Sequence, residues 1–409
     1  MFQGKHVLSI FFFVVFACVI NISHVHGVPG PSSGALEPGF HSAGELLILS
    51  ENETFDEGLV KMGTCRTSGV AWSVAVQGTH AYVAAGPAGL QIINAADPVH
   101  PGRIATCRTP GYAWGVAVSD HFAYVADGSS GLQVIDISDP ENPQRMGEYD
   151  TPGYARGIAV NGDYALIADS ARGLQIIDVA DPENPRGIGS HRILGNCRGV
   201  VITGDYVCVT SYVPESGSGL TIIDISRPDE PRELGHFATS GFAYALAVEG
   251  SNAYVVDWGS GLKIIDISDP ENPSEKGSYA IPWFARGIAI SGGHAFIVDG
   301  HEGMRVMNIE DPKDILHIGD YETPGYALGI CISGQYAYVA DGEAGLEVFR
   351  LPSSGTPRTT LSYTISSDQR SKPMFPYVAS IGTRDPLVGE LIAGRDAKGE
   401  IPLRQRFAA

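Results

Sequence analysis

The sequence predicts an all-β protein: a seven-bladed β-propeller made of four-stranded antiparallel blades. The first observation is a repeated segment, seen as GLQIIN, GLQVID, GLQIID, GLTIID, GLKIID, GMRVMN and GLEVFR. These copies begin at Gly89, Gly131, Gly173, Gly219, Gly261, Gly303 and Gly345, so they are 42 residues apart except for one interval of 46. A second series agrees, because GYAWGVAV, GYARGIAV, GNCRGVVI, GFAYALAV and GYALGICI recur with the same period. A period near 42 without a helical pattern is typical of propeller blades.

Composition is the third observation. The chain has 51 glycines and 26 prolines in 409 residues, while its hydrophobic fraction is 44%. That apolar content is ordinary for a packed protein, and the abundant turn formers favour many short strands joined by tight turns.

One repeat shows the order of the strands within a blade. We expect strands at 155–160, 164–169, 174–180 and 186–191. The Asn161-Gly162 pair is a strong hairpin signal between the first two strands, and DPENP at 181–185 turns the third strand into the outer one. The inner strands are nearly continuous apolar runs, as expected for sheets that are covered on both faces.

The two ends of the array predict how the ring closes. The last copy contains strands at 326–333, 336–341 and 345–351 but no clear fourth strand, whereas the array begins with an extra strand at 59–66. We therefore expect this N-terminal strand to be the outer strand of the last blade, which removes two exposed sheet edges.

The third-strand segments LQVID, LQIID and LKIID resemble those of the LVIVD-repeat propellers. The resemblance covers residues 59–352 and implies a secreted or cell-surface propeller whose biochemical role is generally unassigned. The first, sixth and seventh copies depart from the pattern, with Asn94, Asn308 and Phe349-Arg350 in place of the usual Ile/Val-Asp.

The segments outside the array include a predicted targeting signal. Lys5 and His6 precede a short apolar run over 7–22, and small residues follow near Gly27, which predicts a secretory signal over 1–27. An uncleaved anchor and lipidation at Cys18 are the alternatives. Residues 28–58 are expected to be a flexible leader and 353–409 a poorly structured tail. We expect a secreted, extracellular or cell-surface protein, periplasmic in a Gram-negative bacterium, with no membrane span in the mature chain.

Charge and cysteine content exclude several classes of protein. The chain has 27 Lys and Arg against 46 Asp and Glu, a net charge of −19, which is unfavourable for binding nucleic acid. Five of its six cysteines lie outside the signal and are expected to be small thiols without a disulfide framework. No zinc or haem spacing occurs, so we expect no metal and no cofactor.

One position near the start of each inner strand should face the mouth of the central channel. It is occupied by Trp72, Trp114, Arg156, Arg198, Tyr244, Arg286 and Leu328. Arg156 and Arg198 could hold an anionic group, and Trp72, Trp114, Tyr244 and Trp258 offer flat faces for sugars or aromatic groups. The alternative is that these long side chains only fill the channel.

The end of the second strand carries an aspartate in five repeats: Asp127, Asp169, Asp257, Asp299 and Asp341. We expect each of these residues to be a structural turn cap that accepts hydrogen bonds from the backbone amides of its own turn, as Asx side chains commonly do. Arg156 and Arg286 could also pair with the aspartates of their own blades, Asp169 and Asp299.

Two further features lie on the same face. The fourth repeat has four extra residues within 212–218, most simply a tolerated loop insertion. His301 lies near Glu302 and Glu343 and is a candidate general base or metal ligand. The acidic DPENP turns of the opposite face lack the glycine-bearing loop of short calcium motifs.

Two functions from different classes remain. We favour a non-catalytic extracellular or surface scaffold that binds a protein, a glycan or a small anionic ligand through its loop-bearing face. The alternative is a carbohydrate-active enzyme, a lyase or hydrolase of an acidic sugar, with its site at the channel mouth. No nucleophile elbow, carboxylate pair or metal triad is visible in the sequence, so enzyme activity is uncertain and the balance is against it.

Overall fold

The computed structural model describes residues 59–213, 219–281 and 284–352, together with the backbone of five short strands outside this range. The chain divides into two compact units, one of residues 56–353 and the other of residues 1–55 and 354–409. In the second unit, β1 (Leu8–Phe12) pairs with β30 (Thr359–Tyr363), and β31 (Tyr377–Ala379), β32 (Glu390–Ala393) and β33 (Leu403–Arg406) form a small sheet.

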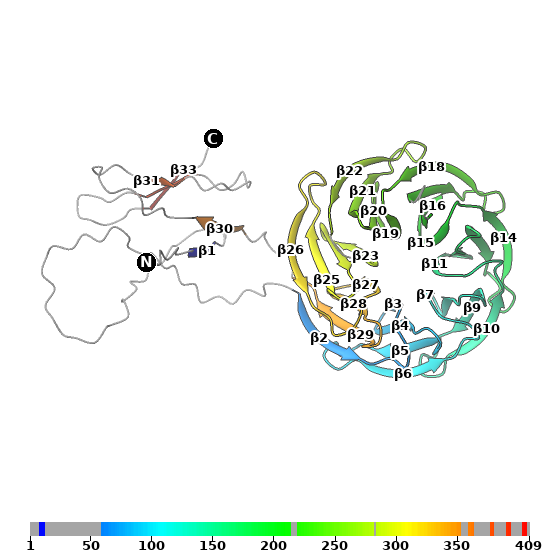
Figure 1. The fold of residues 1–409 in the computed structure, drawn as a ribbon. Coiled ribbons are helices and arrows are strands. Elements are labelled where there is room, and N and C mark those ends of the chain that lie inside the picture. The colour runs from blue at the N-terminus through cyan, green and yellow to red at the C-terminus, as the bar shows by residue number, and fades with distance from the viewer. Residues whose placement is uncertain are drawn as a thin grey trace, which may run out of the picture. The chain divides into compact units, whose positions relative to one another are not determined.

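The first unit is the predicted propeller, with seven four-stranded antiparallel sheets arranged around a central axis (Figure 1). Blade 1 is β3 (Ser73–Gln77), β4 (His80–Ala84), β5 (Leu90–Asn94) and β6 (Gly102–Cys107). Blade 2 is β7 (Gly115–Ser119), β8 (Phe122–Ala126), β9 (Leu132–Asp136) and β10 (Gln144–Tyr149). Blade 3 is β11 (Gly157–Asn161), β12 (Tyr164–Ala168), β13 (Leu174–Asp178) and β14 (Arg186–His191). Blades 4 and 5 are β15 (Asn196–Thr203), β16 (Tyr206–Tyr212), β17 (Gly219–Asp224) and β18 (Arg232–Ala238), then β19 (Phe242–Glu249), β20 (Asn252–Trp258), β21 (Gly261–Asp266) and β22 (Ser274–Tyr279). Blade 6 is β23 (Gly287–Ser291), β24 (His294–Val298), β25 (Met304–Asn308) and β26 (Leu316–Tyr321).

Blade 7 confirms the predicted closure. It consists of β27 (Gly329–Ser333), β28 (Tyr336–Ala340), β29 (Leu346–Arg350) and, as its outer strand, β2 (Val60–Cys65). The register pairs Val60 with Arg350 and Cys65 with Leu346. In Figure 1 the blue strand β2 lies beside the orange strand β29, so the beginning and the end of the array share one sheet.

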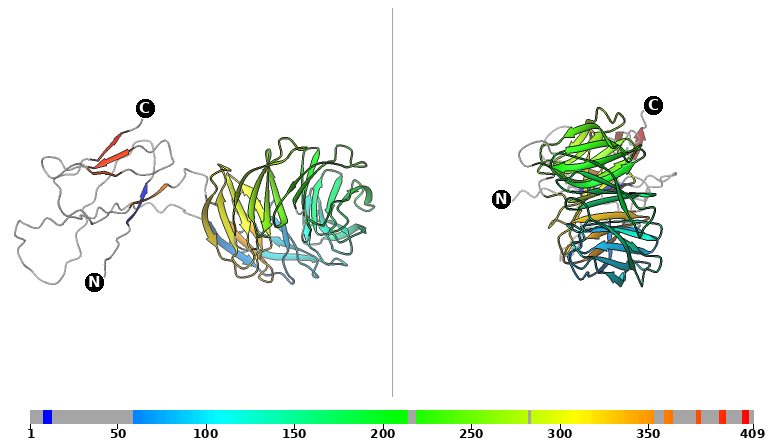
Figure 2. Two further views of the ribbon diagram at one scale, coloured as in Figure 1. Left: turned by 45° about the horizontal axis from the view of Figure 1, so that its top comes forward. Right: turned by 90° about the vertical axis from the view of Figure 1, so that its right-hand side faces the viewer.

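The strand directions place two kinds of loop on each face of the ring, as the side views in Figure 2 help to follow. Each inner strand begins on the face where the second strand of its blade ends, because the two strands are antiparallel. The outer-to-inner connections and the second-to-third loops therefore meet on one face, which we call the mouth face. The DPENP-type turns lie on the other face.

Apolar residues pack between neighbouring sheets. One core cluster, for example, combines Ile92 of blade 1 with Val125 and Ile135 of blade 2. The inner strands approach closely because a glycine opens most of them. A Cβ added at Gly115 would lie 2.6 Å from the carbonyl oxygen of Arg156, and one at Gly329 would lie 2.7 Å from that of Trp72.

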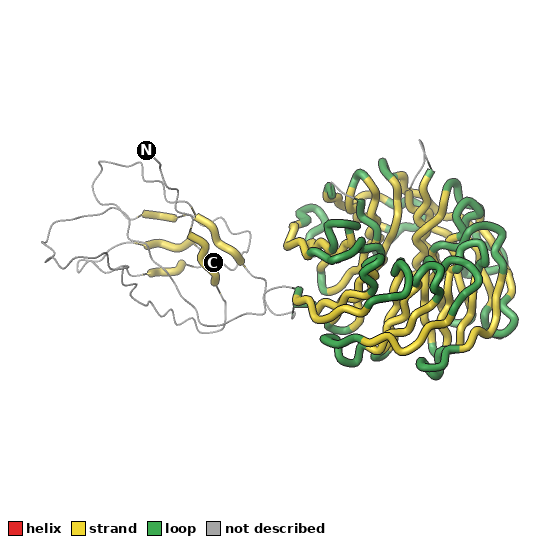
Figure 3. Tube along the Cα trace, turned by 60° about the horizontal axis from the view of Figure 1, so that its bottom comes forward, coloured by secondary structure: helices red, strands yellow, loops and turns green. Residues whose placement is uncertain are grey.

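The terminal predictions lie mostly outside the described residues. Of the signal at 1–27, only Leu8–Phe12 is described, and the leader at 28–58 is outside. Within the part of the chain that is described, no helix is long and apolar enough to cross a membrane. Figure 3 shows strands and loops in that part. Its cysteines are free thiols, namely Cys65, Cys107, Cys197, Cys208 and Cys331.

Candidate functional site

The channel mouth brings together all seven predicted inner-strand residues. A cavity of about 220 Å³ on the axis is lined by Trp72, Trp114, Arg156, Arg198, Tyr244, Arg286 and Leu328. The next layer of its wall is mostly apolar: blades 2 to 7 contribute Val116, Ile158, Val200, Leu246, Ile288 and Ile330, and Ser73 of blade 1 also lines the cavity. The channel is therefore open to a small ligand at the mouth face, although large side chains form its rim.

Aromatic rings and hydroxyl groups hold the three arginines of the rim. Arg198 donates from its Nη1 to the Tyr244 hydroxyl at 2.9 Å, and Arg286 donates to the same hydroxyl at 2.9 Å. Both guanidinium groups also lie over the Tyr244 ring, at 4.5 and 5.1 Å from its centroid. Arg156 lies over Trp114 at 4.5 Å and donates to the Ser170 hydroxyl at 3.2 Å. Aromatic faces and hydroxyls thus fix the cations in place.

Within the described residues, no carboxylate pairs with these three arginines: the ion pairs of the propeller involve other residues. The suggested pairs of Arg156 with Asp169 and Arg286 with Asp299 are therefore not formed. Burial lowers the pKa of Arg198, Tyr244 opposes this effect, and the charges of Arg156 and Arg286 lower the pKa further. The mouth is thus a cationic spot on a strongly acidic chain.

The opposite part of the rim is aromatic. Trp72 and Trp114 have ring centroids 4.2 Å apart. Each indole N–H donates to a tyrosine of the next blade, Trp72 to Tyr112 at 2.9 Å and Trp114 to Tyr154 at 3.0 Å. Since their only donors are used, these tryptophans offer apolar surface to the channel.

Three tyrosines that contact the rim, in addition to Tyr244, were not predicted from the sequence. Tyr112, Tyr154 and Tyr326 stand two residues before the rim position in the GYA segments, where the repeat was visible but was interpreted only as part of the period. Tyr326 accepts from Arg286 at 3.4 Å. Partners in the next blade are about 40 residues away in sequence, so the pairing is evident only once the ring is closed.

Trp258 lies beside the rim and joins an aromatic cluster on the mouth face. Its ring stacks on Tyr244 with centroids 5.6 Å apart and an interplanar angle of 9°, and Arg286 lies over it at 4.4 Å. The centroid of its ring also lies 6.1 Å from that of Phe242 and 4.8 Å from that of Phe284. Phe284, which the sequence analysis did not select, is 55% exposed.

The aspartates at the end of the second strand make structural contacts, but their side chains accept hydrogen bonds from the connection that precedes their blade and not from their own turn. Asp127 accepts from the Thr109 hydroxyl at 2.6 Å and from the Gly111 amide at 2.7 Å, both in the connection from the preceding blade. Asp341 does the same with Thr323 and Gly325. Asp169 accepts from Thr151 and Asp257 from the Gly241 amide.

Asp299 is the exception among these aspartates. Its carboxyl group is buried, and neither oxygen has a hydrogen-bond partner among the described residues. Ile281 stands at the position that Thr109, Thr151 and Thr323 occupy before Asp127, Asp169 and Asp341, and Pro282 and Trp283 lie outside the described residues. Burial raises the pKa of Asp299 to about 6.

His301 is not part of a catalytic group in the described structure. It is exposed, as are Glu302 and Glu343, and its contact is an edge-on one with the ring of Tyr326, 4.5 Å between centroids. Among the described residues no cluster of His, Cys, Asp or Glu could hold a metal ion. The loop insertion at 214–218 lies outside the described residues.

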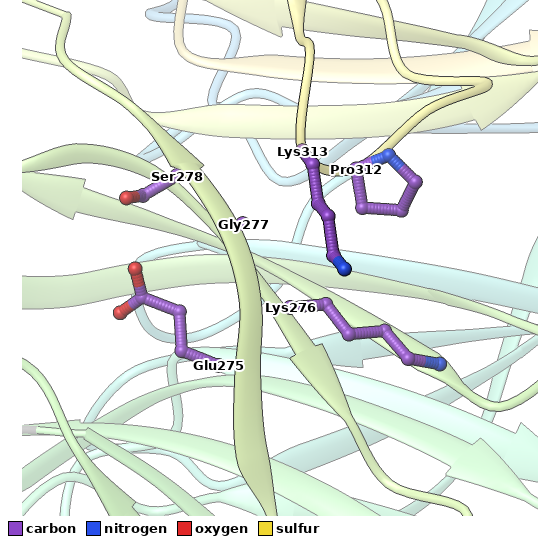
Figure 4. A pocket seen from close by; sticks show the side chains of 6 residues that line it. All are labelled: Glu275, Lys276, Gly277, Ser278, Pro312 and Lys313. Atoms are coloured by element: carbon purple, nitrogen blue, oxygen red, sulfur yellow. The ribbon is translucent and has the colours of Figure 1, made fainter.

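A second hollow, of about 420 Å³, lies at the outer edge between β22 and the turn that contains Pro312 and Lys313 (Figure 4). Lys276 pairs with Asp266 at 3.0 Å and Glu275 with Lys263 at 3.1 Å. The charges of Lys276 and Glu275 are therefore already paired within the chain, unlike those of the arginines at the channel mouth.

The fold and the rim define the class of protein: a seven-bladed β-propeller with a cationic, aromatic channel mouth. The chain belongs to the LVIVD repeat family, whose model matches residues 68–109, 110–151, 152–191, 194–239, 240–281, 284–323 and 324–349. No curated protein matches the sequence.

Solved structures support the fold alone. The β-propeller domain of Cps50 (Swd1) from Myceliophteria thermophila is 14% identical, with a TM-score of 0.58 over 72% of this chain and 99% of that one. BamB from Moraxella catarrhalis is 14% identical, with a TM-score of 0.52 over 74% and 94%. YCF48 from Cyanidioschyzon merolae is 12% identical, with a TM-score of 0.54 over 73% and 100%.

Proposed function

We propose that this propeller is a non-catalytic binding scaffold that acts outside the cell and holds an anionic ligand at the channel mouth. The observation that carries the proposal is the convergence of Arg156, Arg198 and Arg286 without a carboxylate partner in the described residues. Charged groups removed from water are normally paired, so an unpaired cationic group favours an external anion.

The geometry of the arginines also suits this role. Each guanidinium carries five N–H donors in a planar arrangement that matches carboxylate, phosphate and sulfate oxygens. Arg156 and Arg198 each use one donor in the contacts described above, which leaves donors for a ligand. The rigid ring holds them in position, so a ligand does not have to order them first.

The enzymatic alternative has less support. A general base must reach the proton that it abstracts and is commonly oriented by a second group. His301 contacts the Tyr326 ring, and no described carboxylate is hydrogen-bonded to it. We therefore propose binding without chemistry.

The binding test is a thermal-shift measurement in low-chloride buffer with sulfate, phosphate, benzoate and glucuronate. A ligand that binds only the folded ring raises the melting temperature by mass action. We expect at least one anion to raise the melting temperature of the unmodified chain. The same anion should leave the melting temperature of Arg198→Gln unchanged. The matched control is Arg227→Gln, because Arg227 is 65% exposed and pairs with Glu230 at 2.7 Å on the opposite face. Absence of any shift, or an equal shift in both variants, contradicts the proposal.

The location is a separate part of the proposal, supported by the charged start and short apolar run of residues 1–27. Cell fractionation followed by mass spectrometry of the intact chain tests it. We expect a protein outside the cytoplasm whose first residue is Val28. A cytoplasmic chain that retains residues 1–27 contradicts this part and leaves the binding proposal to its own test.

A further inference from the structure

We infer that the ligand of the channel is a small amphipathic anion, with one carboxylate-like head and an apolar body of about one ring. This inference rests on the proposed function and narrows it from anions in general to one chemical class. It follows from how charge, apolar surface and volume are distributed around the rim.

The rim is divided into two arcs. Blades 3 to 6 contribute Arg156, Arg198, Tyr244 and Arg286, whereas blades 7, 1 and 2 contribute Leu328, Trp72 and Trp114. A ligand on the axis therefore meets cations on one side and apolar side chains on the other. A compact anion with charge on all sides would place part of that charge against Leu328 and the tryptophans, where it loses water without gaining a partner.

The hydrogen-bonding state of the two arcs strengthens this division. On the cationic arc, Arg156 and Arg198 each use one donor in the contacts described above, which leaves N–H groups for a ligand, and the Nε–H of Arg286 is buried without an acceptor in the described residues. On the apolar arc, the N–H groups of Trp72 and Trp114 are already donated to Tyr112 and Tyr154. Donors for an anion are thus concentrated on the cationic arc. The apolar arc offers the surfaces of Trp72 and Leu328, whereas the Trp114 ring is partly covered by Arg156.

The wall below the rim is also mostly apolar. Blades 2 to 7 contribute Val116, Ile158, Val200, Leu246, Ile288 and Ile330 to it, and blade 1 contributes Ser73. The body of a ligand whose head is held by the arginines can therefore bury its apolar surface toward the tryptophans or along this wall. Burial of that kind contributes about 25 cal/mol per Å² of apolar surface.

The volume sets the size of the ligand. The cavity holds about 220 Å³, whereas pockets for drug-sized ligands hold about 300–1,000 Å³. A single ring with a carboxylate fits this space, and a folded peptide or a branched glycan does not. The channel therefore favours a small molecule over a polymer.

Isothermal titration calorimetry with four probes tests the inference: benzoate, acetate, inorganic phosphate and the uncharged benzamide. We expect benzoate to bind at least about tenfold more tightly than acetate or phosphate, a difference of about 1.4 kcal/mol. Its binding should show a negative heat-capacity change, the marker of apolar burial. Benzamide should bind more weakly than benzoate because it lacks the charge.

Variants separate the two arcs. Trp72→Gln should lower the affinity for benzoate about tenfold, to the level of acetate, and leave acetate unchanged, since about 1.4 kcal/mol of apolar contact is lost. Phe284→Ala is the matched control, because Phe284 is exposed on the same face but does not line the cavity. Arg198→Gln should lower the affinity for both benzoate and acetate. Circular dichroism of each variant checks that it is folded.

The two proposals fail in different ways. Equal binding of benzoate, acetate and phosphate, or a Trp72→Gln variant with unchanged benzoate affinity, overturns the amphipathic ligand and leaves an anion site. Tight binding of phosphate alone does the same. If no probe binds, or if a probe binds equally well to Arg198→Gln, the anion site itself is overturned.

Discussion

Lys61 Nζ lies 2.7 Å from Glu347 Oε2, and this ion pair joins the first strand of the propeller to the last blade. Lys61 belongs to β2 and Glu347 to β29. Glu347 is only 1% exposed, whereas Lys61 is 44% exposed. Burial raises the pKa of Glu347, and Lys61 opposes that effect. Comparable pairs between third and outer strands are Gln91 with Arg103, Lys263 with Glu275 and Arg305 with Asp320.

Removing Lys61 should therefore open the ring more easily. In Lys61→Ala the buried Glu347 loses its cation, and we expect the free energy of unfolding to fall by about 1–3 kcal/mol, less than for a fully buried pair because Lys61 is partly in water. Urea denaturation measures the change.

The double variant Lys61→Met with Glu347→Met is the matched comparison. Because it removes both charges and keeps apolar volume, its stability should be close to that of the unmodified chain. Arg227→Ala, which breaks an exposed pair with Glu230, should change stability by less than about 0.5 kcal/mol. If the double variant is as unstable as Lys61→Ala, the pair does not explain the effect.

The fold could be predicted from the sequence because every blade repeats the same sequence pattern. The period indicated propeller blades, and the seven copies gave their number. The lack of a clear fourth strand in the last copy identified 59–66 as the closing strand. Predicted strand ends differ by a residue or two: the first strand of blade 3 was expected at 155–160 and is Gly157–Asn161. Ala155 instead makes an isolated bridge to Gly128 of the preceding blade, a contact that local pattern does not encode.

The site was predicted only in part, for a physical reason. The position of the rim residues follows from the repeat, so Arg156, Arg198 and Arg286 were correctly placed at the channel. Their partners were not, because each depends on a neighbouring blade. Asp169 was a plausible partner for Arg156, but it accepts from Thr151, 18 residues upstream in the connection. The recurring Thr-Pro-Gly of these connections was the signal that could have revealed it.

A glycine at the inner strands should be required for the ring to close at its present diameter. A Cβ at Gly157 would collide with the carbonyl oxygen of Arg198 in the next blade. We expect Gly157→Ala to lower the free energy of unfolding by about 2 kcal/mol or more, as overpacking does, and to weaken anion binding by displacing Arg198. Chemical denaturation and titration calorimetry measure the two effects.

Gly102→Ala is the control for this substitution. Gly102 also lies in a strand of the propeller, but a Cβ there would meet nothing within 4 Å and its φ is not positive. We expect its stability to change by less than about 0.5 kcal/mol. Equal effects of the two substitutions would show that close approach of the inner strands is not the cause.

Asp299 should make the stability of the ring depend on pH. Its pKa in the folded chain is raised to about 6 by burial, with further increases from Glu302 and Asp320 that Arg305 opposes. The folded chain then binds more protons than the unfolded chain between the ordinary pKa of 3.8 and about 6, so stability falls as the pH rises through this range. Asp299→Asn removes the charge and should stabilise the chain at pH above 6 by about 1–3 kcal/mol, with little effect at low pH.

Thermal melts of the two chains across this pH range measure the difference. Asp341→Asn is the control, because Asp341 accepts hydrogen bonds from Thr323 and Gly325 and loses one of them on substitution. It should be destabilised by about 1–3 kcal/mol at neutral pH. A stabilising effect of Asp299→Asn that does not depend on pH would show that the buried charge is not its source.

The arginine rim should itself reduce the stability of the unliganded ring. Arg198 is repelled by Arg156 and Arg286, and burial adds to the cost of its charge. Its contact with the Tyr244 hydroxyl is duplicated by Arg286, so little is lost when it is replaced. We expect Arg198→Gln to raise the free energy of unfolding by about 1–2 kcal/mol at low ionic strength.

Added salt should stabilise the unmodified chain more than the variant, because screening relieves the repulsion only where it exists. Arg227→Gln, on the opposite face, should leave the salt dependence unchanged. A destabilised Arg198→Gln chain with unaltered salt dependence would mean that the arginines are structural supports of the channel and that their charges are already balanced without a ligand.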